Sequence, residues 1–133
     1  MGGKNNARAN HIKILLIDDE VAYVNVLSNR LKKRNFYVAK AFSGSEAIQI
    51  LRRQDFDIAV LDLKMEDMDG IEVLKILKKM DPQLAVIMLT GHGSAKAARE
   101  GIEQGAFDYL TKPCELDELI AKIHDAYRKR DNV

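Results

Sequence analysis

Short apolar runs recur along the chain and alternate with segments of helical spacing. The runs span residues 12–17, 37–41, 58–61, 85–89 and 107–110. They are mostly continuous, which is typical of strands that are covered on both faces in a parallel sheet. Apolar residues three or four positions apart follow each run, which predicts helices over residues 21–31, 47–51, 71–77, 97–102 and 116–127.

The residues at the expected element boundaries agree with this alternation. Ser43 and Glu46 form an S-x-x-E capping box, Asp81 and Pro82 stop the third helix, and Gly105 ends the fourth. Strand-then-helix units with right-handed crossovers make an α/β sandwich. We therefore expect a doubly wound five-stranded parallel sheet of order 2-1-3-4-5, which is the flavodoxin-like (βα)5 three-layer sandwich.

The length and composition of the chain are typical of a single globular domain. It has 133 residues, of which 47% are hydrophobic and 31% charged, and a formal net charge of +1. This length suits one domain with a sizeable core. The low net charge argues against direct nucleic-acid binding by this domain.

Cysteine usage and hydropathy indicate the cellular setting. The single cysteine, Cys114, excludes an internal disulfide framework and fits a reducing, cytoplasmic environment. No run approaches the roughly 20 apolar residues of a membrane span, and the first ten residues lack the apolar core of a signal peptide. We interpret residues 1–10 as a disordered leader or an expression remnant, and residues 11–130 as the domain.

Polar side chains follow four of the apolar runs. Asp18 and Asp19 come after IKILLI, Asp62 after IAVL, Thr90 after AVIML, and Lys112 after FDYLT. Ligands of open α/β sheets bind outside the carboxyl ends of the strands, where strand order reverses. Each residue alone has an ordinary interpretation as a cap, a turn residue or a solvated charge. Their joint occurrence favours one site.

Three carboxylates at one edge of a sheet need a cation. A single like-charged pair about 4 Å apart costs on the order of 4 kcal/mol at an effective dielectric near 20. Mg²⁺ prefers oxygen ligands and commonly uses one or two carboxylates together with phosphate oxygens. Because a carboxylate can act as a nucleophile toward phosphorus, we expect Asp62 to accept a phosphoryl group at a metal site formed by Asp18 and Asp19.

These motifs resemble those of the receiver domains of two-component response regulators. The matching segments are KILLIDDE, VLDLKMEDMDG, IMLTGHG and GAFDYLTKP, and the resemblance covers about residues 12–128. It implies that Asp18, Asp19, Asp62 and the backbone carbonyl of Lys64 hold Mg²⁺, with Mn²⁺ as an alternative. Asp62 would then take its phosphoryl group from the phosphohistidine of a sensor histidine kinase or a phosphotransfer domain.

The resemblance also implies a switch. Thr90 and Lys112 would bind phosphoryl oxygens, Tyr109 would change rotamer with Thr90, and the fourth helix, fifth strand and fifth helix would change arrangement. Lys64 and His92 occupy positions that influence the lifetime of the phosphoryl group, although both also suit solvent-facing side chains. The Lys112–Pro113 bond would be cis.

Two departures from the family pattern stand near the site. Glu66 replaces a usual proline and makes the loop after Asp62 more negative, and Cys114 replaces a common aromatic residue and is interpreted as a packing residue. As a receiver, the chain would be no enzyme toward outside substrates, catalysing only its own phosphotransfer and slow autodephosphorylation.

Alternative functions remain at this point. A haloacid-dehalogenase-like phosphatase would place its nucleophile in a D-x-D motif after the first strand, and a flavin-binding module would not place carboxylates where the flavin phosphate binds. A degenerate receiver that works only by docking is the third alternative. The effector, and whether the chain forms a homodimer, stay open.

Overall fold

The computed structural model describes residues 11–91 and 95–131, in which five strands alternate with five helices. The elements are β1 (Lys13–Ile17), α2 (Val21–Lys33), β2 (Tyr37–Ala41), α3 (Gly44–Arg53), β3 (Ile58–Asp62), α4 (Gly70–Met80), β4 (Ala85–Thr90), α5 (Ala95–Glu103), β5 (Asp108–Thr111) and α6 (Leu116–Asp131). The predicted strands differ from these by at most one residue at each end.

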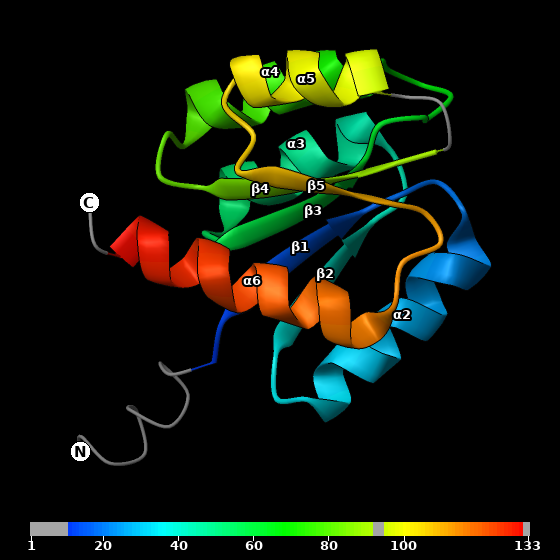
Figure 1. The fold of residues 1–133 in the computed structure, drawn as a ribbon, viewed down its shortest axis with the longest axis vertical. Helices are drawn as coiled ribbons and strands as arrows, with labels where there is room; N and C mark the ends of the chain where they lie inside the picture. Colours follow the sequence, from blue (N-terminus) through cyan, green and yellow to red (C-terminus); the bar gives the residue numbers. More distant parts are fainter. Residues whose placement is uncertain (1–10, 92–94, 132–133) are drawn as a thin grey trace.

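All five strands are parallel and follow the order β2-β1-β3-β4-β5, as predicted. The order reverses between β1 and β3, which pair directly, with Ile17 opposite Leu61. Helices α2 and α6 cover one face of the sheet, and α3, α4 and α5 cover the other (Figure 1). The three-layer sandwich is therefore confirmed, and its switch point lies where β1 and β3 end.

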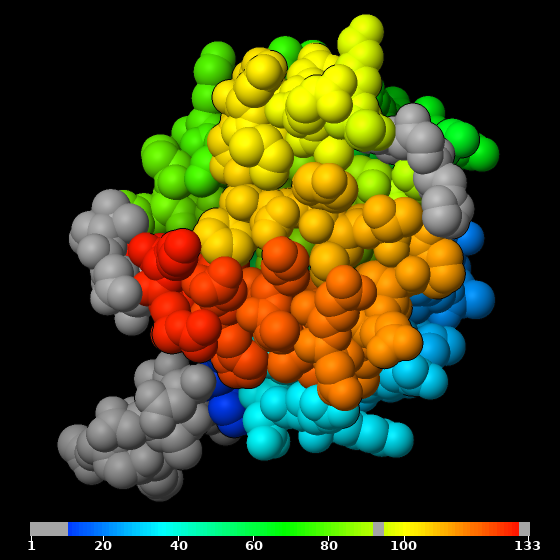
Figure 2. Space-filling model, viewed as in Figure 1, coloured from blue at the N-terminus to red at the C-terminus, as the bar shows by residue number. Residues whose placement is uncertain are grey.

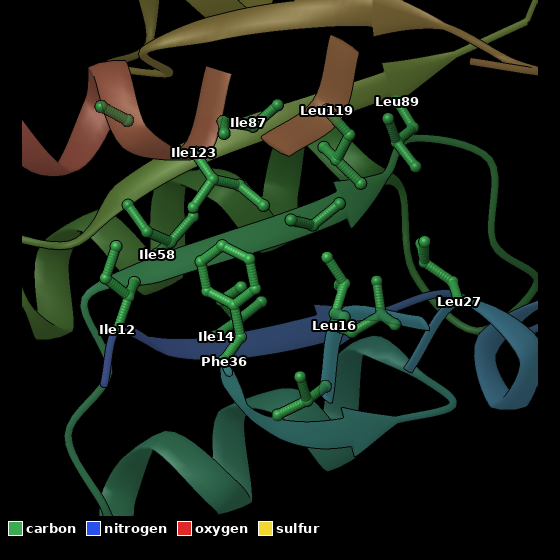
Figure 3. Packing of buried hydrophobic residues seen from close by; sticks show 14 of the residues in the cluster. Ile12, Ile14, Leu16, Leu27, Phe36, Ile58, Ile87, Leu89, Leu119 and Ile123 are labelled. Carbon is green, nitrogen blue, oxygen red and sulfur yellow. The ribbon is translucent and has the colours of Figure 1, made fainter. Parts of the chain in front are cut away.

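Two hydrophobic cores lie on opposite faces of the sheet because side chains of a strand alternate between its faces. On β1, Ile14 and Leu16 join the core under α2 and α6, whereas Leu15 and Ile17 join the core under α3 and α4. Figure 3 shows the first of these cores, in which Leu119 and Ile123 of α6 pack toward the sheet. Burial of each such side chain contributes roughly 1.5–3 kcal/mol.

The expectation that all strands are covered on both faces is correct only for the central three. Every residue of β3 and β4 is buried, and so are four of the five in β1. The edge strands β2 and β5 are partly open, with Tyr37 44% exposed and Tyr109 41% exposed. A continuous apolar run does not distinguish a central strand from an edge strand whose outer residues are large but exposed.

The predicted element boundaries have clear physical causes. Ser43 Oγ accepts the Glu46 N–H at 3.0 Å, while Glu46 Oε1 accepts the N–H of Phe42, which lies one residue before the cap, at 2.6 Å. Helix α4 ends before Asp81, as predicted. Gly105, just after α5, has a φ of +108°, a conformation that favours glycine.

Helix α6 lies across one face of the molecule, with α2 on one side and the β5–α5 region on the other (Figure 2). Its residues Leu119, Ile123 and Ala126 are buried, and they lie three or four positions apart on one stripe.

Among the described residues, no helix combines the length and apolar character needed to cross a membrane.

Candidate functional site

Three carboxylates meet where the order of the strands reverses. Asp62 is the last residue of β3, and Asp18 and Asp19 follow the end of the neighbouring strand β1. One carboxylate oxygen from each lies within 4.8 Å of the other two. Asp18 and Asp62 are buried, and Asp19 is half-buried. The structure thus brings together the three carboxylates that the sequence placed in one site.

Hydrogen bonds hold the first two carboxylates in place. Asp18 Oδ1 accepts a hydrogen bond from the N–H of Glu20 at 3.0 Å, and its Oδ2 accepts one from Lys112 Nζ at 3.0 Å. Asp19 Oδ2 accepts the N–H of Glu66 at 3.0 Å. A proline at this position would have no N–H to donate, so Glu66 adds a hydrogen bond to the site.

The loop that follows β3 is tied to the neighbouring helix α3. Asp67 accepts the N–H groups of Gly44 and Ser45, each at 3.0 Å, and the Ser45 hydroxyl at 3.1 Å. These bonds, the one from Gly44 above all, lower the pKa of Asp67. The chain turns back tightly at Gly70, where a Cβ would lie 2.5 Å from the backbone of Leu63. Each end of the loop is therefore anchored.

Among the described residues, Lys112 is the basic residue that pairs with this acidic cluster. Its Nζ lies 2.7 Å from Glu20 Oε1, 3.0 Å from Asp18 Oδ2 and 3.8 Å from Asp62 Oδ1. The same Nζ lies 4.6 Å from the centre of the Tyr23 ring. Burial alone would lower the pKa of Lys112, but hydrogen bonds to Glu20 and Asp18 outweigh it and raise that pKa.

The surroundings of Asp62 raise the pKa of its carboxyl group. Burial, and then the Asp18 charge, raise its pKa to about 6, while Lys112 and the backbone N–H of Lys64 oppose the rise. Asp62 is therefore largely ionised at neutral pH. One lysine does not balance the carboxylates around it, so the cluster attracts a further cation.

The donor set fits a hard divalent cation. All three converging groups are carboxylate oxygens, and Mg²⁺ prefers oxygen ligands and keeps several waters. An acidic cluster of this kind could hold such an ion without any nitrogen or sulfur ligand. Lys64 itself has an exposed side chain in the loop after β3.

The expected switch residues lie on β4 and β5. Thr90 ends β4 and is only 3% exposed, and its Oγ1 lies 3.5 Å from the Leu110 carbonyl oxygen as a weak donor. Tyr109 lies on the open side of β5. The Lys112–Pro113 bond is cis, as expected. His92 lies outside the described residues.

Two residues in contact with the expected site were missed by sequence reasoning. Glu20 has no assigned role in the sequence analysis, although its position directly after the Asp18 and Asp19 pair is a usable signal. Tyr23 gave no such signal, because its contact with Lys112 depends on how the loop after β5 approaches α2. Burial raises the pKa of Tyr23 to about 12, so its hydroxyl stays protonated.

Cys114 is half-buried against the core under α2 and α6, which fits a packing role. Burial, and then the charge of Glu118, raise the pKa of its thiol. A thiol is far less reactive than a thiolate.

Fold and site together define a doubly wound α/β domain with an acidic site at its switch point. A family model described as the response regulator receiver domain matches residues 14–124. The chain belongs to this family and is the receiver domain of a response regulator, which is a signalling domain rather than a classical enzyme.

Similar structures and relatives agree with this assignment. A CheY-like receiver domain protein from Methanospirillum hungatei JF-1 is 27% identical, with a TM-score of 0.88 over 92% of this chain and 98% of that chain. NtrX from Brucella abortus in complex with ADP is 28% identical, with a TM-score of 0.87 over 91% of this chain and 28% of that chain.

Among curated proteins, the transcriptional regulatory protein ZraR of Escherichia coli (strain K12) is 37% identical over 116 residues, which are 87% of this chain and 26% of the relative. The transcriptional regulatory protein GlrR of the same strain is 38% identical over 113 residues, or 85% of this chain and 26% of the relative. The chain thus spans about a quarter of the length of these relatives.

Proposed function

We propose that this receiver domain takes up a phosphoryl group on Asp62 from the phosphohistidine of a histidine kinase or a phosphotransfer domain, with Mg²⁺ bound nearby. The observation that carries the proposal is the convergence of three carboxylate oxygens within 4.8 Å of one another, with that of Asp62 on a buried side chain. Asp18, Asp19, Asp62 and the carbonyl of Lys64 would hold the ion, which supplies positive charge for the phosphoryl oxygens.

In the transfer, an Asp62 carboxylate oxygen attacks phosphorus, and the bond between phosphorus and the histidine nitrogen breaks. The imidazole leaves with the electron pair of that bond. Phosphoryl transfer depends chiefly on positioning and on neutralising the equatorial oxygens. Lys112, which already lies 3.8 Å from Asp62, supplies positive charge to one of these oxygens, and Thr90 supplies a hydroxyl donor to another.

The new charge of about −1.5 to −2 on Asp62 would pull Thr90 and Lys112 toward it. Tyr109 would then turn inward, and α5, β5 and α6 would shift between two existing arrangements. Helix α5 suits such a shift because only Ala98 and Gly101 of its residues are buried. We propose that Lys64 and His92 tune how long the phosphoryl group persists.

The longer relatives suggest the output. They are transcriptional regulatory proteins more than three times as long as this chain, so we propose that the domain controls an effector of that kind, following a signal from a histidine kinase.

The test is uptake of phosphate from acetyl phosphate, measured by intact mass with Mg²⁺ and with EDTA. The wild type should gain one phosphoryl group only with Mg²⁺, and Asp62→Asn should gain none. Asp57→Asn removes a carboxylate at the opposite edge of the sheet and should leave uptake unchanged. Uptake by Asp62→Asn equal to that of the wild type would overturn the proposal.

A further inference from the structure

We propose that Glu20 is a positioning residue that holds Lys112 in a resting place and competes with the incoming phosphoryl group for it. This inference rests on the proposed function, because it concerns the delivery of Lys112 to phosphorylated Asp62. It assigns a role to a fourth carboxylate that is neither the acceptor nor an expected metal ligand.

The side chain of Glu20 is directed to the lysine rather than to its own helix. Glu20 is the N-cap residue of α2, yet its side chain makes no capping hydrogen bond. Its Oε1 instead accepts a hydrogen bond from Lys112 Nζ at 2.7 Å, a shorter contact than those of the lysine with Asp18 and Asp62. A charge-assisted hydrogen bond of this length belongs to the stronger class.

Helix α2 provides a second wall of the resting place. The Tyr23 ring lies 4.6 Å from the lysine ammonium, and an aromatic face attracts a cation at this distance. The side chain of Lys112 is 19% exposed, whereas that of Glu20 is 63% exposed. The ammonium is therefore held on the α2 side of the acidic corner, where it contacts Glu20 and Tyr23.

Competition follows from the position of the ammonium. Lys112 Nζ is hydrogen-bonded to Glu20 at 2.7 Å and to Asp18 at 3.0 Å, whereas Asp62 Oδ1, at 3.8 Å, lies beyond hydrogen-bond distance. A cation bound to Asp18 would reduce the hold of that carboxylate on the lysine, but would leave Glu20 in place. Glu20 is then the partner that a phosphoryl group on Asp62 must displace, so removing its charge should favour the loaded state.

The test compares Glu20→Gln with wild type in saturating Mg²⁺, using beryllofluoride as a mimic of the phosphoryl group. Binding to Glu20→Gln should be about threefold to tenfold tighter, since a hydrogen bond between charged groups no longer has to be broken. Glu118→Gln is the matched control, because Glu118 lines the same surface groove as Lys112 without pairing with it in the described part of the chain. It should change the affinity by less than about twofold.

A second readout distinguishes a direct Glu20–Lys112 hydrogen bond from the general effect of removing one negative charge. The nitrogen resonance of the Lys112 ammonium should shift in ligand-free Glu20→Gln and stay in place in Glu118→Gln. Unchanged or weaker beryllofluoride binding by Glu20→Gln, or an equal gain in Glu118→Gln, would overturn the inference. If the wild type does not bind beryllofluoride at all, the proposed function fails, and the ammonium resonance still decides whether Glu20 holds the lysine.

Discussion

The two edges of the sheet both carry clusters of charged residues, but the clusters differ in balance. At the amino edge, a cleft is lined by three carboxylates and three basic residues, namely Asp55, Asp57, Asp81, Lys13, Arg52 and Arg130. At the carboxyl edge, one ammonium faces four carboxylates, namely Lys112 against Asp18, Asp19, Glu20 and Asp62.

One aspartate at each edge makes similar hydrogen bonds. Asp57 accepts the Lys13 N–H at 2.9 Å and pairs with Arg130 at 3.2 Å, much as Asp18 accepts one backbone N–H and one lysine proton. Bonding of single carboxylates therefore does not separate a structural ion pair from a functional site. The uncompensated charge at the carboxyl edge does, because it creates the need for a cation.

Removing the basic partner at each edge should give the largest contrast. In EDTA near pH 8, Lys112→Met leaves Asp18, which is 0% exposed, without a cation and should cost about 3 kcal/mol of unfolding free energy. Arg130→Met should cost about 1 kcal/mol, since Asp57 is partly exposed and keeps the Lys13 N–H. Urea denaturation measures both, and equal losses would contradict the difference between the edges.

Removing the charge of Asp62 should raise the free energy of unfolding, whereas removing that of Lys112 should lower it. Its pKa is raised from 3.8 to about 6 on folding, so the folded state binds the proton more tightly, and stability without metal falls as pH rises from about 4 to about 6. In EDTA at pH 7, Asp62→Asn should therefore stabilise the fold by about 2 kcal/mol and flatten this dependence. Asp57→Asn should not stabilise it. Unfolding curves across pH that match those of the wild type would refute the expectation for Asp62.

Magnesium should stabilise the wild type through the carboxyl edge alone. At ten times its dissociation constant, the ion should add about 1.4 kcal/mol to the free energy of unfolding. Asp19→Asn should require markedly more Mg²⁺ for the same gain, whereas Asp81→Asn, at the amino edge, should respond as the wild type does. Thermal unfolding in a Mg²⁺ series measures this, and an equal loss of response in both variants would argue against a localised site.

The smallest contrast concerns the loops at the two edges. Asp67→Ala removes the acceptor for Gly44 and Ser45 and should cost about 1 kcal/mol at neutral pH. Because these bonds lower the pKa of Asp67, the effect should fade only as the pH falls below the ordinary pKa of an aspartate. Asp81→Ala removes only the acceptor of the Gln83 N–H and should cost less. Urea denaturation should rank the two variants in this order; the reverse ranking would be unexpected.

The acidic site could be predicted from the sequence because the carboxyl ends of all strands in a parallel sheet lie at the same edge. Asp18, Asp62, Thr90 and Lys112 each follow a recognisable apolar run, so the strand order alone brings them to one edge. The helix ends at Ser43, Asp81 and Gly105 were equally local. Positions of this kind depend on the residue and its immediate neighbours.

Contacts between loops were beyond such reasoning. Glu20 and Tyr23 reach Lys112 only because the loop after β5 folds back toward α2, and Asp67 caps α3 from a distant part of the chain. The partial exposure of β2 and β5 likewise depends on how far the helices extend over the sheet edges. These features come from three-dimensional packing and leave no periodic pattern.

The most direct test of the claim that Asp62, at the carboxyl edge of the sheet, is the reactive residue is to identify which residue carries the phosphoryl group. After treatment with acetyl phosphate and Mg²⁺, borohydride reduction converts an aspartyl phosphate to homoserine, which peptide mass spectrometry can locate. We predict homoserine at position 62 and none at positions 18, 19 or 57. Homoserine at Asp18, Asp19 or Asp57, or none anywhere in the wild type, would contradict the assignment of Asp62 as the acceptor.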